Sequence, residues 1–468
     1  MPTECNARIE LGRAGRRRVE ASFDAGQVSS DGGVLLLGQL ARGMRLFERV
    51  ASCFEDHRAP DRIEHSVEDL VAQRILGLAC GYEDLNDHQT LRLDGAVAAA
   101  VGKPDPLGRD RVRASDCGAP LAAPATLNRL ENSPAALVPN RRDLKLIHHP
   151  ERFEALFLEL FFEQFDEEPA ELWLDFDATD LPLHGGQEGR FYHGFYDHYC
   201  YLPLYVFCGD HLLVGRLREA NQDGAAGALE DLQRIVAAMR ARWPRVRIVV
   251  RADSGFCRDA LLDWCEEAGV DYVIGLARNA RLQGLAAPFF EGLDADSGPT
   301  RSYGEFRYQT LNSWARERRV VAKAELLGDK RNPRFVVTNL AADSVDAETV
   351  YRDLYCPRGD AENRIKEQFE LFATRVSAQT MRTNQLRLWL SGLAYTLIKA
   401  LRNTALQATD LEFASPSTIR TRLLKLGALV SVSVRRIRVR FSTAAPVQGI
   451  FRKAVAELQA AYPQLDWG

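Results

Sequence analysis

The sequence lacks the features that mark membrane, secreted and zinc-cluster proteins. Its 468 residues include nine cysteines, and no two of them have the short spacing of a zinc-binding pair. A scattered, odd number of cysteines is typical of a chain in a reducing compartment. The longest apolar stretch, residues 388–398, is too short to cross a bilayer, and the first ten residues lack the apolar run of a signal peptide. These absences predict a cytoplasmic protein without membrane contact.

The chain also lacks a dominant charge and any low-complexity tract. Lysine and arginine number 60 and the acidic residues 64, which gives a net charge of −4. This balance excludes a uniformly basic nucleic-acid coat, but it allows a basic face that acids elsewhere offset. The length exceeds that of one ordinary compact core, so we expect two or three domains.

The spacing of apolar residues predicts a mainly helical first part and an α/β second part. In the first part we expect a turn at Asp31-Gly32-Gly33, helices near 66–80 and 86–101, and a loop over 102–125. The second part alternates strands and helices. The expected elements are a helix at 153–165, a strand containing Asp177, a hairpin at 199–207 and 211–217, a helix at 224–242, a strand at 246–250, a helix at 258–268 and a strand at 272–274. This order predicts a mixed sheet with helices packed on it.

The remaining third predicts a β-rich insertion, two helices and a basic tail. Alternating segments at 303–311, 318–326 and 334–340 indicate the insertion, and the helices are expected at about 358–374 and 384–402. In the tail, residues 431–441 alternate with period two.

Two basic segments each have two interpretations. The arginines at 8, 13 and 16–18 form either a solvated arm or an arm on DNA phosphates. Arg436, Arg438 and Arg440 share one face of the predicted strand in the tail, which is either solvated or DNA-facing.

Three acidic residues stand where folding would bring carboxylates to the edge of the sheet. Asp177 lies within one predicted strand, Asp253 directly follows another, and Glu362 lies on a helix between Arg358 and Lys366 at four-residue spacing. A buried carboxylate is costly without a cation or a hydrogen-bond donor. Carboxylates bind hard divalent cations, and two such ions can activate the attacking oxygen and stabilise the leaving oxygen in phosphoryl transfer. The alternative is that the acids form salt bridges, which for Glu362 means a surface charge ladder.

Other polar residues lie near the first acid in the sequence. Asp175 and Asp180 compete with Asp177, and Asp175 is expected on the same face of its strand as Asp177, where it could support the site. His184, Gln187 and Glu188 follow in a glycine-containing loop, either near the site or as ordinary loop polarity.

Three motifs, in this order, resemble those of DDE insertion-sequence transposases. Asp177-Ala178-Thr179 is similar to the D-x-T motif at the first catalytic acid of that group, and Arg251–Phe256 (RADSGF) to the motif at the second. Tyr355, Arg358 and Glu362 have the spacing of the Y-R-E signature of one large transposase superfamily. Three ordered motifs are much more specific than any one of them.

The text around the motifs resembles the bacterial family called IS thirteen-eighty. The likeness covers about residues 170–402 and touches the N-terminal SSDGGVLLL, residues 29–37. One position departs from the pattern, because the signature lysine seven residues past the glutamate falls on Phe369. Lys366, one helical turn after Glu362, is the candidate replacement.

The resemblance implies an RNase H-like catalytic core with a β-rich insertion and a mainly helical N-terminal region. The implied parts are an N-terminal DNA-binding region at 1–150, the core at 151–276 and 346–410, the insertion at 277–345, and a basic C-terminal region at 411–468.

The resemblance also implies roles for individual residues. Asp177, Asp253 and Glu362 would be catalytic and hold two Mg²⁺ ions, for which Mn²⁺ can substitute. The implied DNA contacts are Tyr355, Arg358, Lys366, Trp314, Arg318 and Arg319. For Trp314 the alternatives are stacking on a displaced base and packing in the core. Arg316, Arg318 and Arg319 form one basic cluster beside it.

The function implied is that of a DNA transposase. Such an enzyme binds the terminal inverted repeats of its own element, cleaves a strand at each end in a Mg²⁺-dependent step, and transfers the freed 3′-OH to target DNA. Its partners are double-stranded DNA and a second copy of the chain in the synaptic complex, and its place is the nucleoid. The alternatives are a metal-dependent nuclease on the same fold and a catalytically inactive, domesticated DNA-binding protein.

Overall fold

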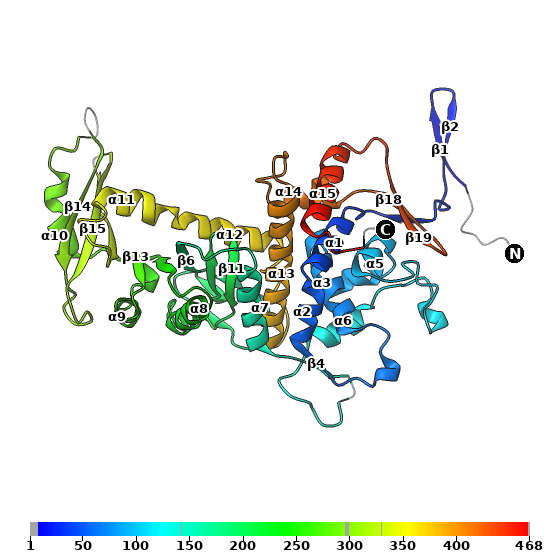
Figure 1. Cartoon of the computed structure of the whole chain (residues 1–468), viewed down its shortest axis with the longest axis horizontal. Coiled ribbons are helices and arrows are strands. Elements are labelled where there is room, and N and C mark those ends of the chain that lie inside the picture. Colours follow the sequence, from blue (N-terminus) through cyan, green and yellow to red (C-terminus); the bar gives the residue numbers. More distant parts are fainter. Residues whose placement is uncertain (1–7, 142, 295–298, 329, 467–468) are drawn as a thin grey trace. The chain divides into compact units, whose positions relative to one another are not determined.

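The computed structural model of the chain describes residues 8–141, 143–294, 299–328 and 330–466 (Figure 1). The first seven residues, which include Cys5, lie outside this range. The expected absence of a signal peptide rests partly on them. The chain divides into two compact units. The helical unit comprises Met1–Pro150, Glu370–Phe372 and Leu390–Gly468, and the sheet unit comprises Glu151–Phe369 and Ala373–Trp389.

The sheet unit is built on one nine-stranded mixed sheet, which confirms the predicted α/β class. Its strand order is β11-β10-β6-β12-β13-β17-β15-β14, with β16 paired to β15. The strands are β6 (Glu171–Ala178), β10 (Leu204–Cys208), β11 (His211–Arg216), β12 (Arg247–Ala252), β13 (Asp271–Leu276), β14 (Arg301–Tyr308), β15 (Arg318–Leu327), β16 (Lys330–Arg331) and β17 (Arg334–Thr338). The central strands β6, β12 and β13 are parallel, and the other pairs are antiparallel. A small sheet of β7 (Leu181–Pro182), β9 (His198–Tyr201) and β8 (Phe191–His193) follows β6.

The two faces of the sheet differ because side chains alternate along each strand. On β6, Leu172, Leu174 and Phe176 pack into the large core formed with α7 (Pro150–Phe162), α8 (Ala228–Arg242) and α9 (Asp259–Ala268). Trp173 belongs to a second core cluster on the other face, which Val350 and Tyr351 cover. Figure 1 shows α8 and α9 on one side of the sheet and a long helical segment on the other.

The long helical segment changes its winding near the middle. It consists of α11 (Ala347–Thr349), the π-helical turn η7 (Val350–Tyr355), the 3₁₀ turn η8 (Cys356–Arg358) and α12 (Gly359–Glu370). Pro357 has no N–H to donate to the preceding turn, which fits a local break in the regular helix. Such irregular turns are frequent at functional sites. The predicted helix from 358 is confirmed, but the helical turns before it were not predicted.

The β-rich segment after residue 277 extends the central sheet. Its strands β17, β15 and β14 continue outward from β13, so the predicted strands are confirmed and form no separate sheet. The segment also contains the helix α10 (Ala280–Ala286) and the turn η6 (Ala287–Phe290), which were not predicted. The strands that carry the candidate acids therefore lie in the interior of one continuous sheet.

The helical unit contains the remaining regular elements. They are β1 (Ile9–Ala14), β2 (Arg17–Ala21), β3 (Gln27–Ser29), α1 (Val34–Gly43), α2 (Leu46–Ser52), β4 (Phe54–Asp56), η2 (Pro60–Arg62), α3 (Val67–Cys80), η3 (Leu85–Asp87), α4 (His88–Leu91), α5 (Gly95–Val101), η4 (Ala114–Asp116), α6 (Pro124–Glu131), β5 (Leu146–His148), α14 (Pro416–Ile419), η9 (Arg420–Leu424), β18 (Ala428–Ser433), β19 (Arg436–Phe441) and α15 (Gln448–Ala461), together with the last sixteen residues of α13 (Met381–Ala405). The predicted helix at 66–80 is α3, whereas 86–101 is broken where Asp94 caps α5. None of the described helices is long and apolar enough to cross a membrane.

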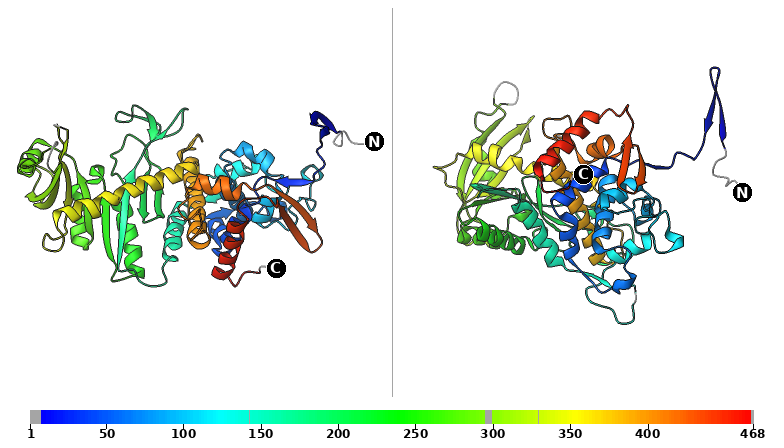
Figure 2. Two further views of the ribbon diagram at one scale, coloured as in Figure 1. Left: turned by 90° about the horizontal axis from the view of Figure 1, so that it is seen from above. Right: turned by 45° about the vertical axis from the view of Figure 1, so that its right-hand side comes forward.

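Both basic segments of the helical unit form hairpins. The expected N-terminal arm is the antiparallel pair β1–β2, almost wholly exposed and standing clear of the other elements of its unit (Figure 2). The predicted strand 431–441 is divided into β18 and β19 by a turn at Val434 and Arg435. Arg436, Arg438 and Arg440 share one face of β19, as expected, and all three are exposed.

The N-terminal SSDGGVLLL segment holds the two ends of the helical unit together. Asp31 is fully buried, pairs with Lys425 Nζ at 2.7 Å and accepts a 2.7 Å hydrogen bond from the Tyr82 hydroxyl. A Cβ on Gly33 would lie 1.9 Å from the carbonyl oxygen of Leu423. Glycine is therefore required at this position, and the motif has a structural role in the unit.

Candidate active site

Asp177 and Asp253 occupy neighbouring positions at the carboxyl ends of two parallel strands. β6 and β12 pair in parallel with Phe176 opposite Ala252. The next residue in each segment is an aspartate, so Asp177 and Asp253 are neighbours. Paired strands lie about 4.8 Å apart, and both side chains leave the sheet on the face opposite the Phe176 core. Asp253 also caps the 3₁₀ turn η5 (Ser254–Phe256) by accepting the Gly255 N–H at 2.8 Å. The structure thus brings the first two predicted acids together.

Arg358 joins the third acid to the first. Its Nη2 lies 3.2 Å from Glu362 Oε1, and its Nη1 lies 4.0 Å from Asp177 Oδ2. Burial raises the pKa of Asp177 to about 6, while the Arg358 charge lowers it and the charges of Asp253 and Glu362 add to the rise. The three acids and Arg358 therefore form one electrostatic cluster on this face of the sheet.

The donor chemistry of this cluster fits a hard divalent cation. Asp177, Asp253 and Glu362 offer only carboxylate oxygens, which Mg²⁺ prefers. Over the described residues, however, no three acidic, imidazole or thiol groups lie close enough together to surround one ion. Arg358 contacts both Asp177 and Glu362, so binding of one ion by all three acids would require Arg358 to leave Glu362. Glu362 is half-exposed, so its side chain has room to turn once Arg358 leaves it.

Asp175 is held by Arg251 and is not a free ligand. Arg251 donates from Nε and Nη2 to the two oxygens of Asp175 at 2.5 and 2.8 Å, and both side chains are almost fully buried. Arg251 also donates from Nη1 to the Leu354 carbonyl at 3.0 Å, and its guanidinium lies 5.2 Å from the Trp173 ring centroid. Arg251 thus fastens the π-helical turn η7 to the sheet. This role was not predicted from the sequence. The two-residue spacing of Arg251 from Asp253, on the same face of β12, was the available signal.

Tyr355 packs against the end of β13 beside Asp253. A Cβ on Gly275 would lie 2.6 Å from the Tyr355 hydroxyl oxygen and 2.9 Å from the Ser254 amide nitrogen. A side chain at Gly275 would therefore displace either Tyr355 or the turn that follows Asp253. Burial raises the pKa of the Tyr355 hydroxyl, so the group stays protonated near neutral pH.

A cavity of about 320 Å³ borders Tyr355 and Ser254. Its lining includes the cations Arg278 and Arg334, both exposed. Of the residues that the structure describes, no acidic one lines this cavity. Both arginines were missed from the sequence, because each lies in a loop or at a strand start and belongs to no recognisable motif.

Trp314 lies in the core of the sheet unit. It is 6% exposed, meets the Tyr308 ring edge-on at 5.8 Å, and lies 5.1 Å from the Arg318 guanidinium. This position favours core packing over base stacking.

The cations next to Trp314 are occupied by acids. Arg318, whose side chain is 1% exposed, donates to Glu266, Asp259 and Asp263 at 2.8, 3.0 and 2.6 Å. Arg319 is bound to Glu305 and to two backbone carbonyls. Their charges are therefore balanced within the protein.

The remaining candidates lie at the margins. Lys366 is exposed and makes no ion pair within the described part of the chain, and Phe369 is partly buried. Asp180 accepts a 2.7 Å hydrogen bond from His198 Nε2, and Glu188 accepts the backbone N–H of Met381 at the start of α13. Asp180 and Glu188 are thus engaged in local structure.

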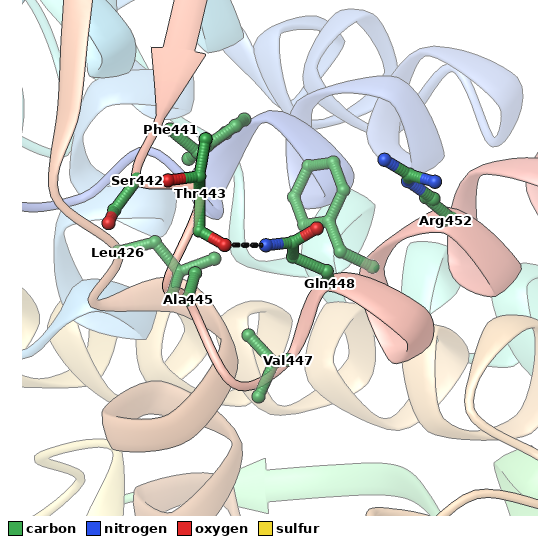
Figure 3. A pocket seen from close by; sticks show the side chains of 9 residues that line it. Leu426, Phe441, Ser442, Thr443, Ala445, Val447, Gln448 and Arg452 are labelled. Atoms are coloured by element: carbon green, nitrogen blue, oxygen red, sulfur yellow. Dashed lines mark hydrogen bonds between the residues drawn. The ribbon is translucent and has the colours of Figure 1, made fainter.

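A further cavity, in the helical unit, has mainly apolar walls. Its volume is about 280 Å³, and it lies between the end of β19 and the start of α15 (Figure 3). Leu426, Phe441, Val447 and Phe451 line it, together with the charged Arg452. Gln448, also in the lining, donates to the Thr443 carbonyl. No acidic side chain is among its described lining residues.

Comparison with known proteins identifies the family. A family model described as "Transposase DDE domain group 1" matches residues 11–463. Among solved structures, the cryo-EM structure of the piggyBac transposase synaptic complex with hairpin DNA matches with a TM-score of 0.40 and 10% identity, covering 92% of this chain and 80% of that one. No curated protein sequence matches. Because the family model covers nearly the whole chain, the protein belongs to the family of transposase DDE domains, group 1.

Proposed function

We propose that the chain is a DNA transposase that cleaves and joins DNA strands with two divalent metal ions held by Asp177, Asp253 and Glu362. The observation that carries this proposal is the parallel register that sets Asp177 beside Asp253, with Arg358 linking Glu362 to the pair. Membership of a transposase family supports the same reading. The metal is Mg²⁺, and Mn²⁺ can replace it.

We also propose a narrower family for the chain and a specific fold for its catalytic core. The spacing of Tyr355, Arg358 and Glu362 supports the Y-R-E signature and the IS thirteen-eighty family. The strand order β11-β10-β6-β12-β13, with the last three strands parallel, supports an RNase H-like core.

The chain's own residues position and release the acids. Bound metal ions would activate the attacking oxygen and stabilise the leaving oxygen of the phosphodiester. Asp177 lies on the interior strand β6 and Asp253 directly follows the interior strand β12, so both supply fixed oxygens, whereas Glu362 reaches in from α12. A DNA phosphate is a better partner for the Arg358 fork than one carboxylate oxygen at 3.2 Å. Arrival of DNA would therefore draw Arg358 from Glu362 and free that carboxylate for metal.

The first DNA-binding site that we propose is the cavity beside Tyr355. Contacts through Trp314, Arg318 and Arg319 would require these side chains to leave the core and the acids that hold them. Arg278 and Arg334 are exposed and form no ion pair with the described side chains, and Lys366 is exposed one helical turn after Glu362.

Removing both cavity arginines tests this placement. The double variant Arg278→Ala with Arg334→Ala is expected to bind DNA about 10-fold more weakly at 0.1 M salt, with a salt dependence shallower by roughly 2, because each lost phosphate contact lowers the slope by about 0.9. Fluorescence anisotropy over a salt series measures both quantities. Arg307, an exposed arginine on β14 outside the cavity lining, is the control position. Equal losses in the control would remove the cavity from the DNA path.

The helical unit is the proposed region that binds the transposon ends. At the tip of the β1–β2 hairpin Arg13 lies directly opposite Arg18, and Arg16 and Arg17 adjoin them. Like charges placed opposite each other destabilise a hairpin, so this tip is suited to an anionic partner. A two-stranded ribbon also fits the major groove of DNA. Two ends held together require two copies of the chain, which makes the synaptic form a homodimer.

Strand cleavage is the experiment that tests the function. Purified protein is incubated with Mg²⁺ and a plasmid that carries the DNA flanking its gene on both sides, and a chelator-treated sample is the control. Cuts at both element ends with an excised linear product are expected. Cleavage scattered over any DNA would replace the proposal with a metal-dependent nuclease. Binding without cutting, in Mg²⁺ and Mn²⁺ alike, would replace it with an inactive DNA-binding protein.

A further inference from the structure

The helical unit contains a second strongly basic cavity within residues 58–146. Its volume is about 360 Å³, and its lining includes seven arginine and lysine side chains against three carboxylates. Such an excess of one charge around one cavity is unfavourable unless an opposite charge is supplied.

The carboxylates of this cavity do not supply that charge to all of its cations. Glu64 Oε1 lies 2.9 Å from Arg111 Nε, and Asp143 is bound by Arg141, at 2.7 Å. Asp116 lies 3.9 Å from Arg111 and is similarly distant from a second arginine. Each acid is thus already engaged with an arginine.

Arg58 and Arg62 pair with Asp56 and Asp61, at 2.7 and 3.9 Å, which lie outside the lining. Three cations of the lining are left over. Arg113, Arg129 and Lys145 form no ion pair with any described side chain. Arg113 and Arg129 are exposed, and Lys145 is partly buried. Both arginines can therefore be reached from solution by a large ligand.

Apart from Arg111 Nε and Glu64 Oε1, which face each other at 2.9 Å, two buried atoms of the described lining have no hydrogen-bond partner, and both are donors. Arg111 donates from Nη1 to His65 Nε2 at 2.6 Å, and an arginine can only donate, so Nε2 is the accepting nitrogen of the ring. Burial, with the charges of Lys103 and Arg111, lowers the pKa of His65 to about 4, so the ring is neutral and carries its proton on Nδ1. His65 is 5% exposed, and its Nδ1 has no hydrogen-bond partner among the described protein atoms. Arg92 is only partly buried, but its Nε atom is buried and likewise has no hydrogen-bond partner among the described protein atoms. Buried donors without acceptors are rare in folded proteins.

We propose that this cavity binds phosphate groups of a nucleic-acid backbone through Arg113, Arg129 and Lys145. The ligand it suits is an anion that only accepts hydrogen bonds, because the unmatched groups are cations and donors. Phosphate oxygens have this chemistry. The assignment to DNA rests on the proposed transposase function; a free phosphate or nucleotide shares the chemistry and is the other source. The exposed arginines favour a polymer, which can reach beyond the cavity.

A pair of charge-matched double variants tests the site. Arg113→Gln with Arg129→Gln removes two unpaired cations of the cavity, so loss of the fold is not expected. Arg422→Gln with Arg452→Gln removes two exposed arginines of the same unit outside this cavity. Affinity for a labelled duplex is measured by anisotropy over a salt series. The cavity pair is expected to bind about 10-fold more weakly at 0.1 M salt with a slope shallower by about 2, and the control pair to change by less than about twofold.

Titration of wild type with inorganic phosphate and with adenosine triphosphate separates the two sources. Sub-millimolar binding that the cavity pair loses, with unchanged DNA affinity, would make the cavity a small-anion site and overturn the DNA assignment. Equal weakening of DNA binding in both double variants would show that only the net charge matters, and would overturn the proposed site. The plasmid assay is run on the same proteins. A cavity pair that binds DNA normally while wild type cuts the element ends would refute only this inference; wild type that neither binds nor cuts would refute the proposed function.

Discussion

Changing Asp177 to asparagine is expected to abolish strand cleavage and, at the same time, to stabilise the folded protein. Asparagine cannot provide the anionic oxygen that a divalent metal requires, so we expect the cleavage rate to fall by about 1,000-fold or more, beyond the 10- to 100-fold typical of an outer-shell change. DNA binding should persist, because the change removes a negative charge from the site.

The stabilisation follows from the pKa of Asp177. Burial raises it from 3.8 to about 6 in the folded protein. Between these values the folded chain binds more protons than the unfolded chain, so stability decreases as the pH rises through this window. Above about pH 6 the charged, buried carboxylate exerts its full destabilising effect. The neutral isostere removes it, and we expect a free energy of unfolding about 2 kcal/mol higher at pH 8.

Denaturant titrations at several pH values and the plasmid assay measure the two effects. The stability difference between variant and wild type should shrink as the pH falls from 8 to 4, because wild-type Asp177 then becomes protonated. Asp180→Asn is the control, since Asp180 is engaged with His198 and should remain dispensable for cleavage. A variant that is less stable than wild type, or that retains a tenth of its cleavage rate, would contradict the assignment of Asp177.

The sequence was sufficient for those parts of the fold that follow from local patterns. Alternating strand and helix segments predicted the mixed sheet and its hairpin at Cys208-Gly209-Asp210, where Gly209 has the positive φ that such turns favour. The turn at Val434 and Arg435 contains no glycine, asparagine or proline, so the tail was predicted as one strand. The β1–β2 hairpin was missed because its strands are polar and bury almost nothing.

The candidate site was predictable in its acids but not in its cations. Asp177 and Asp253 follow strands, and the parallel register that pairs them is the ordinary outcome of such strands. The pairing of Arg358 with Asp177 and that of Arg251 with Asp175 join residues far apart in the sequence, and only the fold brings them together. The same applies to Arg318, which looks like a free basic residue in the sequence but is surrounded by three acids from α9.

Replacing Arg251 by methionine is expected to destabilise the protein by about 3 to 5 kcal/mol, because it leaves Asp175 buried without its partner. Asp175 is 3% exposed, and burial already raises the pKa of its carboxyl while Arg251 lowers it. Without Arg251 the pKa should rise further, so the loss of stability should be largest at high pH and smaller at low pH. Adding Asp175→Asn to the variant removes the unpaired charge and should restore part of the loss.

Arg247→Met is the matched control, because Arg247 lies on the same strand and the same face as Arg251 and also pairs with acids of neighbouring strands. The Arg247 side chain, which pairs with Glu171 and Asp271, is 48% exposed. Such exposed ion pairs contribute about 1 kcal/mol or less to stability. Arg251 further holds the Leu354 carbonyl, so Arg251→Met should speed amide hydrogen exchange in the π-helical turn η7, whereas Arg247→Met should not. Equal and small losses of stability in the two variants would show that Arg251 does not fasten η7 to the sheet. The packing of Val350 and Tyr351 alone would then hold Tyr355 and Arg358 over the acids.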